Sequence, residues 1–156
     1  MKYFPIKCDK KPDSYHSGAG KFGANRDNGT RNHGGSDLYA KVGTEVYATD
    51  EGIIRRISDK FYRNVGSIEI VHKTWIGRYC EITPLPILKV GDMIKAGQLI
   101  GYVAKIDGLN ISMLHLEMYD DPEIKSPLTV TGLNKYNRRA DIVDPTKFLD
   151  SAEIKK

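Results

Sequence analysis

The sequence predicts a mainly β fold in which short antiparallel strands form one sheet or a sandwich. Three observations predict it: the apolar runs are short, Gly, Pro, Asn and Asp divide them, and no segment carries a long, capped helical period. From Leu38 onward the expected strands lie at residues 45–48, 52–57, 67–72, 76–83, 99–104 and 112–119. We expect at most one short helix, at residues 147–152.

Turn signals separate these elements. The residues before Leu38 are rich in Gly, Asn, Asp, Ser and Lys, which predicts a loop-rich N-terminal segment. Its glycines do not follow a predicted strand within a βαβ unit, so a phosphate-binding loop is disfavoured. Glycine-containing turns at residues 41–44 and 89–97 each precede an expected strand, at positions where a positive φ would be needed.

Length and composition predict a single domain. A chain of 156 residues with 40% hydrophobic content can bury one full core, but it is too short for two comfortable domains. We therefore expect residues 1–156 to form one domain, with its core at about residues 14–150. We expect Cys8 and Cys80 to be free thiols, because two cysteines in a chain of this size do not make a disulfide framework.

The charge pattern argues against a nucleic-acid partner. Lys and Arg number 24 against 20 Asp and Glu, and the basic residues are scattered. No apolar run is long enough for a signal peptide or a membrane-spanning helix. We therefore expect a monomer that is made in the cytoplasm without a signal peptide and has no membrane span.

Two short segments carry residues that suit a catalytic metal. The first is His33-Gly-Gly-Ser-Asp37, whose glycines would let the backbone turn tightly so that the flanking side chains converge. In residues 112–119 strict alternation puts His115 and Glu117 on the same face. Two imidazoles and a carboxylate are a ligand set for catalytic zinc, which keeps its fourth position for water. Taken alone, either segment would more often hold packed or solvated side chains than metal ligands.

Several segments, in order, resemble the M23 metallopeptidases, the lysostaphin-like peptidoglycan endopeptidases. The run from His33 through Asp37 to Ala48 is similar to the opening of that family. Further similar segments follow in the family's order, at residues 68–72, 89–101, 115–117 and 144–149. Upstream, Phe22-Gly-Ala-Asn-Arg26 resembles the family's entry to the site. The resemblance covers roughly residues 14–150, and the ordered combination is more specific than any single piece.

The resemblance implies a compact antiparallel β domain of the lysostaphin-like (duplicated hybrid motif) type, with a groove bounded by loops. It implies that His33, Asp37 and His115 hold one zinc ion, since they match the ligand positions one for one. It also implies that the substrate is a peptide cross-link or stem of peptidoglycan, and that metal-activated water hydrolyses the amide.

Two positions depart from the family pattern. Met113 stands where most members have a histidine near the scissile bond, and a thioether cannot transfer a proton. Glu81 replaces a second histidine that normally follows a tyrosine by two residues. A carboxylate beside an activated water is a competent general base, so Glu81 is the candidate catalytic residue. The alternative is that Glu81 is a solvated or ion-paired strand residue and that the site binds zinc without turnover.

Four further residues are candidates at this site. Alternation places Tyr79 and Glu81 on one face, so we expect Tyr79 in the groove. Tyr79, Arg26 and His16 are candidates for binding substrate or the oxyanion. Glu117 is expected to orient a metal ligand or to pair with an arginine.

The sequence therefore predicts a zinc endopeptidase that cleaves bacterial peptidoglycan. The alternative is a catalytically inactive zinc-binding module that binds cell wall or a protein partner. The expected absence of a signal peptide and of a wall-targeting module is typical of a phage lysis enzyme, released through another protein's pore, or of a delivered antibacterial toxin. Either would act in the periplasm or on the cell wall.

Overall fold

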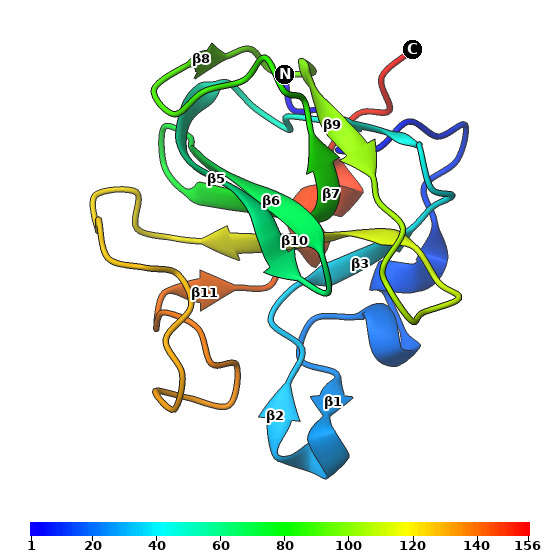
Figure 1. Ribbon diagram of the computed structural model, residues 1–156, viewed down its shortest axis with the longest axis vertical. Coiled ribbons are helices and arrows are strands. Elements are labelled where there is room, and N and C mark those ends of the chain that lie inside the picture. The colour runs from blue at the N-terminus through cyan, green and yellow to red at the C-terminus, as the bar shows by residue number, and fades with distance from the viewer.

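The computed structural model describes residues 1–156, and most of its strands join one antiparallel sheet (Figure 1). The sheet has nine strands, and its main path runs in the order β11 (Ile142–Val143), β10 (Met113–Tyr119), β7 (Ile76–Pro84), β6 (Val65–Val71), β5 (Gly52–Tyr62) and β8 (Met93–Ile94). Off this path, β3 (Ser36–Tyr39) pairs with β10, while β9 (Leu99–Val103) pairs with β7 and with β4 (Glu45–Tyr47). Every pair is antiparallel, which confirms the predicted fold class.

The remaining elements are short and lie around this sheet. A separate two-stranded ribbon, β1 (Asn25–Arg26) and β2 (Arg31–Asn32), extends at the lower end of the molecule in Figure 1. The helical elements are the 3-10 turns η1 (Asp13–Tyr15), η2 (Gly18–Gly20) and η3 (Asp27–Gly29), and the α-helix α1 (Thr146–Ser151). None of them is long and apolar enough to cross a membrane. Both cysteines are free, as expected.

The strand β5 is longer than the sequence predicted. It continues past residue 57 to Tyr62, which pairs with Val65 of β6. The two residues between them, Arg63 and Asn64, both have positive φ, at 38° and 63°, as a two-residue hairpin of the primed type requires. The dipeptide Arg-Asn is a weaker hairpin signal than Asn-Gly, so the sequence did not mark the turn at these two residues. The end of the strand was therefore predicted too early, at residue 57.

A hydrophobic core lies on one side of β10 and leaves the other side for polar residues. Eighteen buried residues form the main cluster, among them Leu114 and Leu116 of β10. His115 and Glu117 alternate with these leucines and therefore face away from the core. This alternation places two potentially functional side chains on a face that is still buried, because all seven residues of β10 are buried.

Candidate active site

Three potential metal ligands meet where β3 pairs with β10. Asp37 lies directly opposite His115 in the register of the two strands, and His33 precedes β3. Oδ1 of Asp37 lies 2.8 Å from Nδ1 of His115 and 3.0 Å from Nε2 of His33. The two imidazole nitrogens are themselves 3.0 Å apart. All three side chains are buried.

Gly35 permits this close approach. A Cβ atom added to Gly35 would lie 2.7 Å from Nε2 of His115 and 2.6 Å from the carbonyl oxygen of Leu116. The backbone bends at Gly35, and neither Gly34 nor Gly35 has a positive φ. Glycine is needed at residue 35 because the ring of His115 packs against the backbone there.

Hydrogen bonds orient both imidazoles toward Asp37. Nδ1 of His33 donates to the carbonyl oxygen of Lys21 at 2.8 Å, which leaves Nε2 to face Asp37. Nε2 of His115 donates to Oε1 of Glu117 at 3.0 Å, which leaves Nδ1 to face Asp37. Once a bound metal displaces any proton from the two inner nitrogens, three electron-pair donors point at a common centre.

The electrostatics of this cluster favour a positive charge at its centre. Burial opposes ionisation of Asp37, but hydrogen bonds from His115 and His33 lower its pKa to about 2. Burial likewise disfavours charge on His115, but its hydrogen bonds to Asp37 and Glu117 raise its pKa to about 10. The two carboxylates that flank His115 therefore stabilise either a proton or a cation at this position.

The donor set fits zinc. Ligand atoms of a tetrahedral zinc lie roughly 3.3 to 3.5 Å apart, given bond lengths of about 2.0 to 2.1 Å. The three atoms of His33, Asp37 and His115 are separated by 2.8 to 3.0 Å, so a few tenths of an ångström of expansion would suffice. Two nitrogens and one oxygen are also the donor types that zinc accepts.

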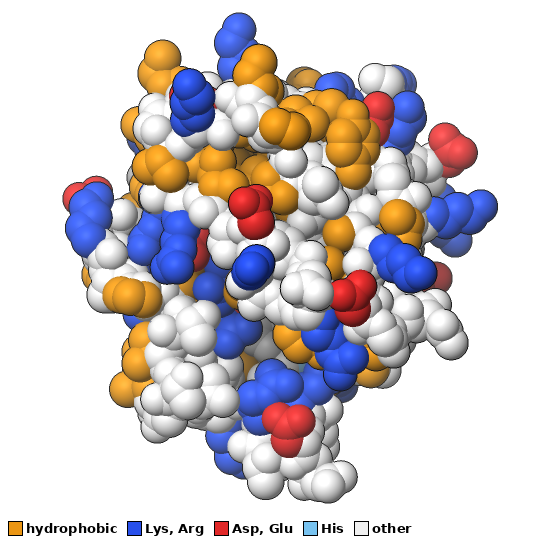
Figure 2. Space-filling view, in the orientation of Figure 1, with side chains coloured by type: hydrophobic (Ala, Val, Ile, Leu, Met, Phe, Trp, Pro, Cys, Tyr) orange, Lys and Arg blue, Asp and Glu red, His pale blue; other side chains and the backbone are white.

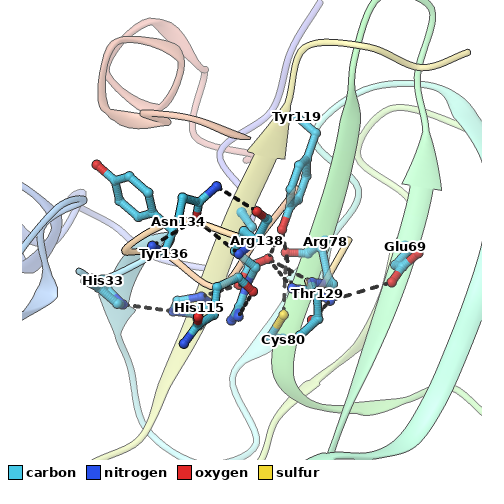
Figure 3. A network of polar contacts seen from close by, with 12 residues as sticks. His33, Glu69, Arg78, Cys80, His115, Tyr119, Thr129, Asn134, Tyr136 and Arg138 are labelled. Atoms are coloured by element: carbon cyan, nitrogen blue, oxygen red, sulfur yellow. Dashed lines mark hydrogen bonds and ion pairs between the residues drawn. The ribbon is translucent and has the colours of Figure 1, made fainter. Parts of the chain in front are cut away.

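Glu117 is the centre of a buried network behind His115 (Figure 3). Its carboxylate accepts hydrogen bonds from Nε of Arg78 at 2.8 Å and from Nε of Arg138 at 2.9 Å. The hydroxyl of Tyr119 donates to the same carboxylate. Burial alone would raise the pKa of Glu117, but the neighbouring Arg78 holds it well below its usual range. Glu117 is therefore a charged acceptor that fixes the ring of His115.

Sequence reasoning missed both arginines of this network. Arg78 lies directly opposite Glu117 in the register of β7 and β10, so a correct pairing of these strands would have found it. Arg138 comes from the irregular segment between β10 and β11, where no periodicity places side chains.

A β-bulge directs Glu81 toward the ligands. Cys80 of β7 pairs with Ser67 and Ile82 pairs with Gly66, which leaves Glu81 as the extra residue between them. Glu81 has φ of +65°, a left-handed conformation that is strained for a side chain of this size. Its Oε2 atom is buried without a hydrogen-bond partner, and the residue lines the same groove as the three ligands. Burial raises the pKa of Glu81 to about 7.

The same bulge corrects the prediction for Tyr79. Because the alternation is interrupted at residue 81, Tyr79 faces the core while Glu81 faces the groove. The side chain of Tyr79 is fully buried, and its hydroxyl lies 2.7 Å from Oγ1 of Thr49. Tyr79 therefore cannot contact a substrate in the groove.

The structure separates the other two candidates for substrate binding. His16 does not line the groove; its Nε2 lies 2.7 Å from Oδ1 of Asp150, and its ring packs at a tilt against that of Tyr15. The prediction for His16 was wrong because η1 directs this side chain toward the C-terminal helix. Arg26 does line the groove, and its Nη2 lies 3.7 Å from Oδ2 of Asp37.

The groove has a volume of about 510 Å³ and is lined by apolar and polar side chains, which we call its apolar wall and its polar wall. The apolar wall includes Phe61 and Tyr62 at the end of β5. The loop at residues 104–112 contacts the adjacent hairpin turn, where Nη1 of Arg63 donates to the carbonyl oxygen of Asp107. Met113 belongs to the apolar wall and packs with Val65, Ala104 and Ile106. The polar wall contains the metal ligands and Glu81. Its other charged residues are Arg26, Arg31 and Arg138.

Comparison with protein families identifies residues 31–127 as a match to peptidase family M23. Peptidoglycan DD-endopeptidase ShyC of Vibrio cholerae is 30% identical over 99 residues, which cover 63% of this chain and 22% of that protein. Glycyl-glycine endopeptidase ALE-1 of Staphylococcus capitis is 33% identical over 91 residues, which cover 55% of this chain and 24% of that protein. The aligned part thus spans less than a quarter of each of these relatives.

Solved structures agree with the fold. The catalytic domain of lysostaphin from Staphylococcus simulans superposes with a TM-score of 0.62 at 24% identity, covering 86% of this chain and 90% of that one. The structure of cbpa from L. salivarius REN superposes with a TM-score of 0.63 at 23% identity, covering 88% of each chain. These likenesses confirm the expected lysostaphin-like fold.

Proposed function

The chain belongs to peptidase family M23, and from this premise we propose that it is a zinc-dependent endopeptidase that hydrolyses peptide bonds in bacterial peptidoglycan. The names of its relatives support the substrate class, since both are endopeptidases and one is named for peptidoglycan. The observation that carries the proposal is the carboxylate of Glu81. It is buried, lacks a hydrogen-bond partner and shares a groove with three convergent metal ligands.

His33, Asp37 and His115 would hold the zinc ion. A bound zinc ion supplies a Lewis acid that activates water and polarises the scissile carbonyl. The chain's contribution is to aim the three ligand atoms. Lys21 and Glu117 accept the outer N–H groups of His33 and His115, so the inner nitrogens stay available to the metal.

Glu81 would be the general base. Its free Oε2 atom would take a proton from the attacking water and deliver it to the leaving amine, so Glu81 returns to its starting carboxylate form. An unpartnered carboxylate at a strained φ is costly for folding, and such a cost is typical of functional positions. The bulge that produces the strain also turns the side chain of Glu81 toward the groove.

Arg26 would assist the oxyanion. Its guanidinium is in the polar wall, and Nη2 lies 3.7 Å from the ligand Asp37. A cationic donor beside the metal can stabilise the negative charge that develops on the carbonyl oxygen during attack.

An inactive, zinc-binding module that binds cell wall is the second candidate. The observation that favours it is Met113, which stands at a histidine position of most of the family and packs into an apolar cluster. Met113 cannot transfer a proton, so activity depends on Glu81 carrying out both transfers. Binding to cell wall without release of peptide products would support this candidate.

Mass spectrometry of muropeptides after incubation with zinc-loaded protein tests the proposal. We expect new amine and carboxylate ends within the peptide part of the muropeptides, and the mass of each product identifies the bond that is cut. Intact muropeptides across several wall chemistries would contradict the proposal. The proposal extends to a phage lysis enzyme or an antibacterial toxin acting at the cell wall, and a neighbouring holin or immunity gene would distinguish these two.

A further inference from the structure

We propose that the groove selects an anionic peptide, whose free carboxylates are bound by Arg31 and Arg138 in the polar wall. This inference rests on the proposed function, because it names the charge of the substrate that the same site takes. Peptide stems of a cell wall occur with free carboxylates or with amidated ones, so the charge of the substrate is a real choice for such an enzyme.

The ribbon β1–β2 places two arginines side by side. Arg26 lies directly opposite Arg31 in the antiparallel register, so their side chains share one face. Like charges at such positions destabilise a strand pair, and an anion bound between or beside them would offset the repulsion. In Figure 2, Lys and Arg side chains gather over and just above this ribbon.

Arg31 has free donors. Its Nε donates to Oδ2 of Asp27 at 2.7 Å, while its two terminal nitrogens make no hydrogen bond within the protein. Asp27 is a weak competitor for this guanidinium, because the side chains of Arg31 and Asp27 are 33% and 62% exposed. A second carboxylate could therefore bind the outer edge of the guanidinium in a bidentate manner.

Arg138 also keeps one free donor beside the ligands. Its Nε donates to Glu117 and its Nη1 donates to the carbonyl oxygen of Asn137, which leaves Nη2 without a partner. Its Cγ lies 3.4 Å from the position that a Cβ of Gly34 would occupy, so the side chain passes directly next to Gly34, the residue that follows His33. A carboxylate bound here would sit close to the metal ligands.

The charges of the lining do not balance within the protein. Arg26, Arg31 and Arg138 face the groove, against the carboxylates of Asp37 and Glu81. The metal would neutralise the charge of Asp37, while Glu117 behind the wall pairs with both Arg78 and Arg138. With zinc in place the groove would be positively charged, which favours an anion over a neutral peptide.

Binding to two matched peptides tests this inference. The probes are a fluorescent stem pentapeptide with free carboxylates and the same peptide with those carboxylates amidated. Fluorescence anisotropy with zinc-loaded protein measures both affinities without requiring turnover. We expect the free acid to bind about tenfold or more tightly, as expected for a charge-assisted bidentate pair. Arg31→Gln should remove most of that preference.

Two further variants distinguish an effect of the groove on binding from an effect of the protein's overall charge. Lys41→Gln removes the same charge from an exposed site outside the groove and should keep the preference. Asp27→Asn frees the guanidinium of Arg31 and should tighten binding of the free acid. Circular dichroism and zinc content confirm that each variant is folded.

The outcomes also separate this inference from the proposed function. Equal affinity for acid and amide, or a preference unchanged in Arg31→Gln, would overturn the inference even if both peptides are hydrolysed. A preference that depends on Arg31, without any hydrolysis, would support the inference and count against the endopeptidase.

Discussion

Nε2 of His115 donates a 3.0 Å hydrogen bond to Oε1 of Glu117, on the opposite edge of the ring from Asp37. The carboxylate is fully buried and is held by Arg78 and Arg138. A ligand histidine whose outer N–H is bound by a carboxylate has one tautomer and one ring orientation. The link thus connects the proposed metal site to charges on β7 and on the segment before β11.

Glu117→Gln should weaken both zinc binding and the fold. A neutral amide no longer supports His115, so we expect zinc affinity to fall by about 10- to 100-fold. Arg78 would keep a buried charge without its main partner, which should lower the free energy of unfolding by about 3 kcal/mol. Zinc titration and chemical denaturation measure the two effects. The exposed Glu123→Gln is the control, and a Glu117 variant as mild as this control would refute the role of the network.

Zinc content tests the ligand set. We expect one zinc per chain in protein purified without added metal, and loss of zinc in His33→Ala and His115→Ala, because each removes one of three ligands. His16→Ala should retain its zinc, since His16 lies outside the groove. Elemental analysis gives the stoichiometry. Zinc near zero in the wild type, or full retention in both ligand variants, would remove the site.

His72 should make the fold sensitive to acid. Its Nδ1 donates to the carbonyl oxygen of Glu51 at 2.8 Å, its ring stacks on Trp75, and burial lowers its pKa to about 4. The unfolded chain, with an ordinary pKa near 6.5, binds this proton more readily, so stability is full above about pH 6.5 and declines as pH falls toward 4. The loss for this one group is up to about 3 kcal/mol.

Denaturant unfolding of wild type and His72→Gln between pH 7.5 and 4 isolates this contribution. The variant is expected to be less stable at neutral pH but to lose less stability on acidification, because it has no proton to bind. Parallel pH profiles of the two proteins would show that His72 does not cause the acid sensitivity.

Glu81 should destabilise the metal-free fold at alkaline pH. Burial raises its pKa to about 7, so the unfolded chain loses this proton first and stability falls as pH rises from about 4.5 through 7. With zinc removed by a chelator, Glu81→Gln should be more stable than wild type at pH 8, by up to about 3 kcal/mol. The gain should vanish near pH 4.5. Thermal unfolding at both pH values checks this, and an equal difference at both would contradict it.

The strands were predictable where alternation is regular. Leu114 and Leu116 alternate with His115 and Glu117, so the strand predicted at residues 112–119, with His115 and Glu117 on one face, matches β10 to within one residue. The convergence of His33 with His115 could be expected only because the ordered motifs resemble a family. Spacing in sequence alone does not bring residues 82 positions apart together.

The errors have two physical causes. The orientation of Tyr79 was wrong because a single extra residue at Glu81 breaks the two-residue period, and no local signal such as glycine marks this bulge. Arg138 and the contact of His16 with Asp150 were not foreseen because they depend on how irregular segments pack, which periodicity does not describe.

Turnover by Glu81→Gln tests the central claim most directly. The variant keeps the size of the side chain but loses the basic carboxylate, so we expect turnover of a purified cross-linked muropeptide to fall by about two to four orders of magnitude. Met113→Leu, which preserves apolar packing in the same groove, should keep most of the activity. Both variants are compared with wild type at equal zinc content. Activity of Glu81→Gln within about threefold of wild type, with zinc bound, would contradict the assignment of Glu81 as the general base.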